Sequence, residues 1–416
     1  MNNYSSSIRP LIISVTICLL FISTEFFGWR KISFLSIRHV SLFIVPIVLL
    51  YYRFKILWKE SRLFMLLLSY YVFVSILGLF NGLYEDVGVT LVLGRFLPSI
   101  IIFYYIISAV RDNTTFHYTI CGLIGIAVID AFVTILQGLG NPIGWAIGLF
   151  FMNPDSTDVV DTEMLSLGKS ITYGMIGTVV ANGFYLASYG LLFCYPLIHK
   201  RNLKGIIMSS VLCVIFFLAL YYNQQRAAFY VYSLLSVFII FYLVINSKKS
   251  LVLILAVVIL FVFLLFISNG LFDNVEFGRL ENVGSDAFDS RHERHQWFYS
   301  SFLPDHLLFG DRTEYVNRYG QTPHNMLIET FLLGGLFGVV IFLYFVFSYL
   351  LYEYRLFVNR RYNQLMMSLP IVAVFFISWE HSNGIHTGLS QSIFLFAIFE
   401  VFLKFNSPAK KYKIRH

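Results

Sequence analysis

Residues 251–268 read LVLILAVVILFVFLLFIS, and only the final serine of this run is polar. A run of this length and composition can cross the hydrocarbon core of a bilayer as a helix. The whole chain has the same character, since 58% of its 416 residues are hydrophobic and 13% are charged. Soluble domains have roughly 45–50% apolar and about 25% charged residues. The composition therefore excludes a soluble enzyme, a disulfide scaffold and a DNA-binding module, and it predicts a membrane protein.

Outward from this run, twelve apolar segments follow one another along the chain. Each should be an α-helix, because a backbone that faces lipid must satisfy its hydrogen bonds internally and because the runs lack the alternation of barrel strands. The sequence predicts an all-α polytopic membrane protein with about twelve transmembrane helices, which form a single transmembrane domain over residues 1–416. Segment 141–151 is a candidate for a helix that enters the membrane without crossing it. The twelve segments lie at about 11–28, 38–52, 63–83, 89–110, 118–140, 173–197, 205–223, 227–245, 251–268, 325–351, 365–380 and 385–404.

Lysine and arginine predict the orientation of these helices. With an even number of helices and a cytoplasmic N-terminus, the inner loops and termini hold 19 of the 30 basic residues. The positive-inside rule then places both termini in the cytoplasm. The first apolar segment is expected to be a retained helix, because no convincing small-residue cleavage site accompanies it. Three basic residues of the first hairpin favour the opposite orientation: Arg30, Lys31 and Arg38.

Two long polar stretches fall on the outer side in this orientation. One covers about 152–172, and the other is a large loop over 269–324, between helices nine and ten. The large loop holds nine acidic residues, five arginines and four histidines. Connections longer than about 12–15 residues are uncommon and are often functional. We therefore expect the chemistry of the protein at the outer face.

The densest group of charged residues in the large loop is SRHERHQWFY at 290–299. At helical spacing Arg291, Arg294 and His295 share one face, and Trp297 is of the type found at membrane interfaces. The alternative interpretation is an amphipathic surface helix whose charges are simply solvated.

A second group of candidates begins the apolar segment that follows the loop. His324 and Asn325 follow Pro323 at a predicted helix start, where free N–H groups and the helix dipole favour an anion. Glu329 lies within the apolar run, and a carboxylate at such a position is costly enough to suggest a function. The alternative for His324 is an ordinary interface residue. Close helix packing is expected at the glycines that follow, Gly334, Gly335 and Gly338.

Further charged residues are predicted at the same outer face. Arg226 lies in the short turn NQQRAAF at 223–229, and its planar guanidinium suits phosphate oxygens; alternatively it extends to lipid headgroups. A polar outward-facing cavity is indicated because other charged or titratable residues are predicted on this side, namely Arg95, Asp130, Glu380 and His381. The sequence contains no zinc-type spacing, phosphate-binding glycine loop or nucleophile elbow, so we expect no metal and no cofactor.

Three stretches carry a resemblance to a known family. NQQRAAF, SRHERHQW and LLFGDRTEYVNRYGQTPHNMLIETFLLGGLFGVVIF are similar to the arginine turn, loop element and His-Asn helix of the O-antigen ligase and O-antigen polymerase superfamily. These bacterial membrane proteins assemble glycans. The expected twelve helices, cytoplasmic termini and single large outer loop also resemble that family. The motifs cover about 225–345, and the architecture covers most of the chain.

The resemblance implies a GT-C-like protein of the bacterial inner membrane whose active site faces the periplasm. Its reaction would be a metal-independent, inverting transfer of a glycan from undecaprenyl diphosphate to a hydroxyl acceptor. Arg226, Arg291 and Arg294 would bind the diphosphate, and His324 would orient or deprotonate the hydroxyl. Glu329 would orient the imidazole. Supporting positions would be Asn325, Arg95, Glu380 and His381, with Glu380 as the other candidate to orient the imidazole.

The resemblance leaves two reactions open, and we favour one of them. A polymerase joins lipid-linked repeat units, whereas a ligase transfers the finished chain to lipid A-core. The 44 phenylalanines, 27 tyrosines and divergent motif context favour the polymerase. A flippase for the same lipid-linked oligosaccharide is the third alternative. The expected partners are that oligosaccharide, membrane lipid and a chain-length regulator, without nucleic acid, and Arg226, Arg291 and His324 are expected to meet at the outer mouth of the bundle.

Overall fold

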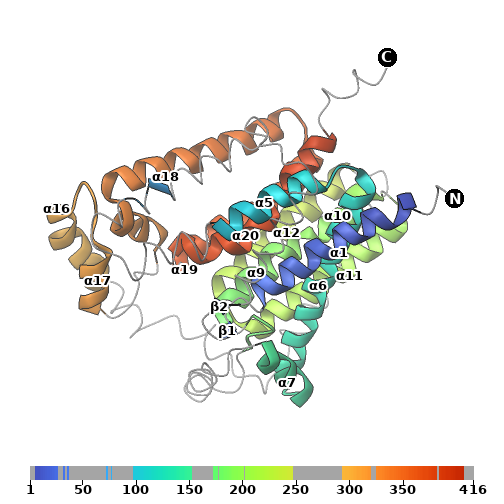
Figure 1. Ribbon diagram of the computed structural model, residues 1–416, viewed down its shortest axis with the longest axis horizontal. Coiled ribbons are helices and arrows are strands. Elements are labelled where there is room, and N and C mark those ends of the chain that lie inside the picture. Colours follow the sequence, from blue (N-terminus) through green and yellow to red (C-terminus); the bar gives the residue numbers. More distant parts are fainter. Residues whose placement is uncertain are drawn as a thin grey trace. The chain divides into compact units, whose positions relative to one another are not determined.

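Figure 1 shows the computed structural model, which describes the parts of the chain given at the end of this paragraph. At Arg226, Glu380 and His381 it describes the backbone but not the surroundings of the side chain. The apolar segments predicted at 38–52 and 251–268, most of 63–83, and the positions Arg95, Arg291 and His324 lie outside the described residues. The described residues are 5–26, 31–32, 35–36, 72–73, 76, 97–151, 172–176, 178–200, 202–246, 293–319, 325–381 and 384–406.

The described residues are almost entirely helical. Among them the strands are a short antiparallel pair, β1 (Lys31–Ile32) and β2 (Leu35–Ser36), and turns connect the helices. The remaining elements are α1 (Ser5–Glu25), α5 (Leu97–Ala109), α6 (Asn113–Gly138), α7 (Pro142–Phe151), α9 (Val179–Gly190), the 3-10 helix η3 (Leu191–Phe193), α10 (Cys194–His199), α11 (Leu203–Asn223), α12 (Arg226–Asn246), the π-helix η4 (Phe298–Phe302), α16 (Leu303–Asp305), α17 (Arg312–Tyr319), α18 (Met326–Val358), α19 (Tyr362–His381) and α20 (Gly384–Asn406).

Several of these helices are long and apolar enough to cross a membrane. In the part of the chain that the structure describes there are four: Ile8–Glu25 within α1, Asn113–Gly138, Leu203–Asn223 and Met326–Val358. Three shorter helical stretches are also apolar, Pro142–Phe151, Ala227–Ile240 and Tyr362–Ser378. The chain is therefore a helical membrane protein. The count of about twelve crossings also depends on segments outside the described residues and stays a prediction.

The chain divides into two compact units. Unit one contains residues 1–122, 284–371 and 378–416, and unit two contains residues 123–283 and 372–377. In unit one, α5 packs along α20, and both contact α1. Aromatic rings fill this contact, with the Phe21 and Phe394 centroids 4.9 Å apart. The hydroxyl of Ser14 donates to the carbonyl oxygen of Thr115 over 3.0 Å, so a polar contact also joins α1 to the start of α6.

α18 in unit one is interrupted at Gly335. This residue has φ +57° and ψ −155°, which are not helical values, and this combination of angles is essentially restricted to glycine. The turn at 307–310 packs against α18 at this interruption, and the Leu307 carbonyl oxygen accepts a hydrogen bond from the Leu336 N–H over 2.9 Å. Gly335 thus permits a close approach, as expected for this glycine cluster, but its neighbour is a turn and not a second helix.

Unit two corrects the prediction of one continuous helix over 173–197. Residues 172–176 are not helical, Gly174 has φ +58°, and the helical part of the segment is divided into α9, η3 and α10. Side chains of α6 explain the difference. Gln137 Oε1 accepts from the backbone N–H groups of Tyr173 and Gly174 over 3.1 and 2.9 Å, and Asp130 Oδ1 accepts from Met175 N–H over 2.7 Å. The backbone N–H groups of this segment are therefore bonded to buried side chains of α6, and they hold the segment in a non-helical conformation.

Candidate functional site

The first turn of α18 is built around Asn325 and Glu329. Asn325 is the N-cap, and its Oδ1 accepts from the backbone N–H groups of Leu327 and Ile328 over 3.0 and 3.1 Å. Such a cap satisfies donors that have no partner inside the helix. Because the side-chain oxygen of Asn325 is engaged in this way, its contribution to the site is to fix the helix start on which Glu329 is mounted.

Glu329 is a buried carboxylate with an arginine partner. Its side chain is 1% exposed, and its Oε1 accepts a hydrogen bond from Nε of Arg312 over 2.9 Å; the Arg312 side chain is 17% exposed. A buried charge is tolerated only when it is paired and hydrogen-bonded. The second oxygen, Oε2, has no hydrogen-bond partner among the described residues. One oxygen is therefore held in place, and the other has unused capacity to accept a hydrogen bond.

Arg294 adds a second cation, and this one is buried. It is 5% exposed, and the charges of Arg294 and Glu329 both act on the phenol of Tyr315. Burial raises the pKa of Tyr315 to about 12, with Arg294 lowering it and Tyr319 and Glu329 raising it. Arg294, Arg312, Tyr315 and Glu329 thus form one cluster, buried except for part of Arg312, which we call the Glu329 cluster.

Aromatic side chains pack around the Glu329 cluster. Phe298 and Phe302 of η4 pack with Tyr315 of α17 and Phe331 of α18 in one apolar core. Trp297 lies at its edge, and the guanidinium of Arg318 is 4.5 Å from the centre of the Trp297 ring. An apolar surrounding of this kind strengthens electrostatic interactions within the cluster.

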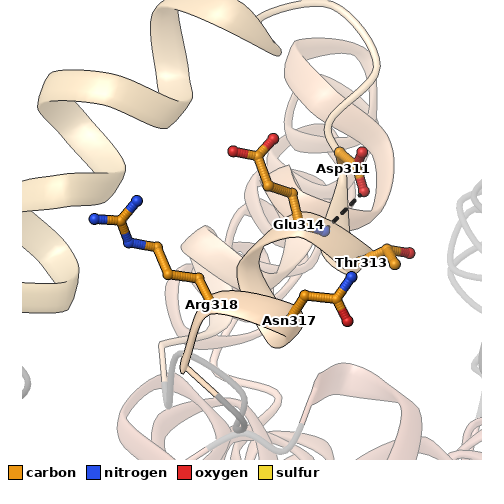
Figure 2. A pocket seen from close by; sticks show the side chains of 5 residues that line it. All are labelled: Asp311, Thr313, Glu314, Asn317 and Arg318. Atoms are coloured by element: carbon orange, nitrogen blue, oxygen red, sulfur yellow. Dashed lines mark hydrogen bonds between the residues drawn. The ribbon is translucent and has the colours of Figure 1, made fainter.

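A polar pocket lies beside α17, as Figure 2 shows. Its volume is about 540 Å³, and it is lined by Asp311, Thr313, Glu314, Asn317 and Arg318. Asp311 Oδ1 accepts from the Glu314 N–H over 3.2 Å, and His306 Nε2 lies 2.7 Å from Glu314 Oε2. His306, Asp311 and Glu314 could together hold a metal ion, since their ligand atoms lie within 4.8 Å of one another. The helix cap and the His–Glu contact already account for this arrangement.

In unit two the turn between α11 and α12 presents Arg226 as the first residue of α12. α11 ends because Gln224 adopts a left-handed conformation, with φ +57°. Asn223 Nδ2 donates to the carbonyl oxygens of Thr172 and Val179 over 2.8 and 3.2 Å, which fixes the turn. The predicted tight turn is therefore present, with Arg226 at a helix N-terminus.

The predicted site residues are thus distributed over the chain. Unit one brings Arg294, Asn325 and Glu329 to the start of α18, whereas Arg226 belongs to unit two. The backbones of Glu380 and His381 end α19. The predicted meeting of Arg226, Arg291 and His324 involves positions outside the described residues and stays a prediction.

Two members of the Glu329 cluster, Arg312 and Tyr315, were not among the sequence candidates. Both lie in the stretch DRTEYVNRY, which belongs to the third motif. A buried carboxylate requires a cation, and this requirement is the signal that could have led to Arg312. Comparison with known proteins adds no assignment: no family model matches the chain, and no curated protein matches it.

Proposed function

We propose that this protein is an inner-membrane glycosyltransferase that uses an undecaprenyl-diphosphate-linked oligosaccharide as donor. The observation that carries the proposal is the Glu329 cluster, in which a buried carboxylate in the first turn of a membrane-crossing helix is accompanied by a partly buried arginine, Arg312, and a buried one, Arg294. Nucleotide-activated sugars are absent outside the inner membrane, so a transferase at that face requires a lipid-linked donor. Such a donor combines a diphosphate, which needs cations, with a long apolar tail.

The reaction is an inverting transfer to a hydroxyl acceptor at the periplasmic face. The acceptor oxygen attacks the anomeric carbon, the bond from that carbon to the diphosphate oxygen breaks, and the lipid diphosphate leaves with the bonding electrons. Arg226, Arg291 and Arg294 stabilise the charge that develops on the leaving group. His324 takes the proton of the attacking hydroxyl, a role suited to its ordinary pKa near about 6.5.

Glu329 acts on His324 as a positioning residue. Arg312 holds Oε1, and Oε2 is the oxygen that accepts from the imidazole in this scheme. Arg95, Glu380 and His381 are supporting positions at the same face. Fixed guanidinium groups take the place that a metal ion has in other transferases, and both chain termini are cytoplasmic.

We favour a repeat-unit polymerase over a ligase that transfers polymer to lipid A-core. A lipid-linked glycan flippase is the candidate from another class, and the break of α18 at Gly335 favours it, because discontinuous helices are common in transporters. A chain-length regulator is a further proposed partner of the polymerase.

Purified protein in lipid vesicles with one defined lipid-linked repeat unit tests these alternatives. A polymerase lengthens the glycan and releases undecaprenyl diphosphate, a ligase does so only when lipid A-core is added, and a flippase moves the unit without changing it. His324→Ala and Arg291→Ala are expected to abolish transfer with normal membrane insertion. Arg226→Lys should also have low transfer activity, because an ammonium group keeps the charge but loses the bidentate hydrogen bonding of a guanidinium.

Arg9→Lys is the matched conservative control, since Arg9 is exposed near the N-terminus and outside the proposed site. Full activity of all three site variants would remove the proposed site. In cells, deletion of the gene gives core with a single repeat unit if the protein is a polymerase. Unsubstituted core with accumulated lipid-linked polymer indicates a ligase.

A further inference from the structure

The turn at 307–310 is attached to α18 by its backbone. Besides the hydrogen bond from Leu336 N–H to Leu307 O, the turn is closed by Gly310 N–H, which donates to His306 O over 3.0 Å. A Cβ atom on Gly335 would collide with the carbonyl group of Leu308, and one on Gly310 would collide with the carbonyl oxygens of Phe331 and Leu332. The turn is therefore fixed at one height along α18.

The tip of this turn consists of three exposed apolar side chains. Leu307, Leu308 and Phe309 are 46%, 49% and 50% exposed. The Phe309 ring contacts the ring of Phe337 on α18, with centroids 6.1 Å apart. The tip thus continues a stripe of exposed apolar residues that follows helical spacing along α18: Leu336, Phe337, Val340, Leu343, Tyr344 and Phe347.

The length of α18 indicates how the tip lies relative to the bilayer. Its 33 residues form about 50 Å of helix at about 1.5 Å per residue, which exceeds the hydrocarbon thickness of about 30 Å. The part after Gly335 is about 34 Å long on the same basis and can cross the hydrocarbon core by itself. The tip then lies beside the first turn of the crossing part, at the edge of the hydrocarbon region.

Polar groups occur directly beside the tip. His306 and Asp311 flank it in the sequence, and Arg318 of α17 contacts Trp297, the residue before η4. Tryptophan and arginine are typical of the membrane–water interface. Non-helical backbone is tolerated at the membrane where protein groups satisfy its hydrogen bonds, and Leu307 O and Gly310 N–H are satisfied in this way.

We propose that Leu307, Leu308 and Phe309 insert into the bilayer as an anchor, with lipid acyl chains as the partner of this surface. The observation that selects lipid is the continuity of the tip with the exposed apolar stripe of a membrane-crossing helix. Part of the loop that the sequence places in water is then embedded, and Arg312 and Glu329 are held at the membrane surface. This inference is independent of the proposed enzymatic function.

Thiol labelling of the full chain in lipid vesicles tests the anchor. Leu308→Cys and Thr313→Cys place a thiol on the tip and on the lining of the polar pocket, and both side chains are exposed. With a charged, membrane-impermeant maleimide, Leu308→Cys is expected to react more slowly than Thr313→Cys by about tenfold or more, because the reactive thiolate is disfavoured in apolar surroundings. The unsubstituted chain gives the background from its four cysteines, and labelling in denaturant confirms that each new thiol is present.

Fluorescence with brominated lipids identifies what covers the tip. Leu308→Trp should be quenched more strongly by brominated than by ordinary phosphatidylcholine, and Thr313→Trp should show a smaller difference. Equal labelling rates of the two cysteine variants would overturn the proposal. Slow labelling without quenching would also overturn it, since a protein surface and not lipid would then cover the tip. Phe309→Cys and Phe309→Trp repeat both measurements if the Leu308 variants fold poorly.

Discussion

Nε of Arg312 lies 2.9 Å from Oε1 of Glu329, and this hydrogen-bonded ion pair joins α17 to the first turn of α18. The carboxylate is buried, whereas part of the arginine reaches the surface. Removal of the cation would leave a buried negative charge without its partner, which is more costly than removal of both charges. The pair therefore connects the loop before α18 to the first turn of that helix and gives the buried carboxylate a cationic partner.

Arg312→Met is expected to lower the free energy of unfolding by about 3–5 kcal/mol, the usual cost of breaking a buried pair by removal of one partner. The double variant Arg312→Met, Glu329→Leu should recover most of this loss, because no charge is left buried. Thermal unfolding in detergent, followed by circular dichroism, measures both. A double variant that is no more stable than Arg312→Met would contradict the account of the pair.

The second prediction concerns the glycines at the interruption of α18. Gly335→Ala should destabilise the protein by about 1–3 kcal/mol, because alanine is strained in the backbone conformation of Gly335. The clash of the added Cβ atom with Leu308 increases this loss. Gly310→Ala should behave similarly, since it also has a positive φ and faces carbonyl oxygens. Gly125→Ala is the control. Gly125 is exposed within α6 and no atom would contact its Cβ, so alanine should stabilise by up to about 1 kcal/mol.

Sequence patterns located most of the described helices because an apolar run and a membrane-crossing helix have the same length. The runs at 118–140, 205–223 and 385–404 correspond to α6, α11 and α20 with ends only a few residues away. α18 extends beyond the predicted 325–351 to Val358. Its last turns include Glu353, whose carboxylate accepts from Ser368 Oγ over 2.6 Å, and this contact between helices cannot be read from hydropathy.

One residue of the candidate site could be predicted from the sequence, and its partner could not. The cost of a carboxylate in an apolar run singled out Glu329 without knowledge of its surroundings. Its partner Arg312 is 17 positions away in sequence, and no periodicity relates a residue in one helix to a residue in another at that separation. The fold decides that pairing, as it decides the burial of Arg294, which the sequence presents only as one face of a charged helix.

The third prediction concerns Gln137, whose side chain makes four hydrogen bonds in unit two. Its Oε1 accepts from Tyr173 and Gly174, and its Nε2 donates to the carbonyl oxygens of Gly144 and Gly174, each over 3.1 Å. Gln137→Met keeps a similar volume but leaves these buried groups without partners, at about 1–3 kcal/mol for each unsatisfied group. Stability should fall strongly, and hydrogen exchange of the Tyr173 and Gly174 amides should become faster.

Ser188→Ala is the control for Gln137. Ser188 is also buried, but among the described residues its hydroxyl donates to carbonyl oxygens of its own helix, those of Phe184 and Tyr185. Its removal leaves no buried backbone donor unpaired, so a small effect is expected. If Gln137→Met were no more harmful than Ser188→Ala, the 172–176 segment would not depend on the Gln137 side chain.

The last prediction is a pH dependence that arises from Tyr315. Burial raises its pKa from the ordinary 10.0 to about 12. Above pH 10 the phenol ionises in the unfolded chain while it stays protonated in the folded one. The folded state then binds more protons, and stability falls as pH rises. The contribution is fully present below pH 10 and is lost as the pH approaches 12. Tyr315→Phe should therefore reduce the loss of stability over this range.

At neutral pH the same variant should change stability little, because the Tyr315 hydroxyl has no hydrogen-bond partner among the described residues. Tyr299→Phe is the matched control, since it removes a hydroxyl from an exposed ring on the preceding π-helix. Unfolding midpoints of the three proteins, compared below pH 10 and near pH 12, measure the effect. An alkaline loss in Tyr315→Phe as large as in the unsubstituted chain would mean that the phenol is not held neutral by burial. Because Arg294 and Glu329 act on the phenol with opposite signs, Arg294→Met should raise the Tyr315 pKa further, which absorbance at phenolate wavelengths would detect.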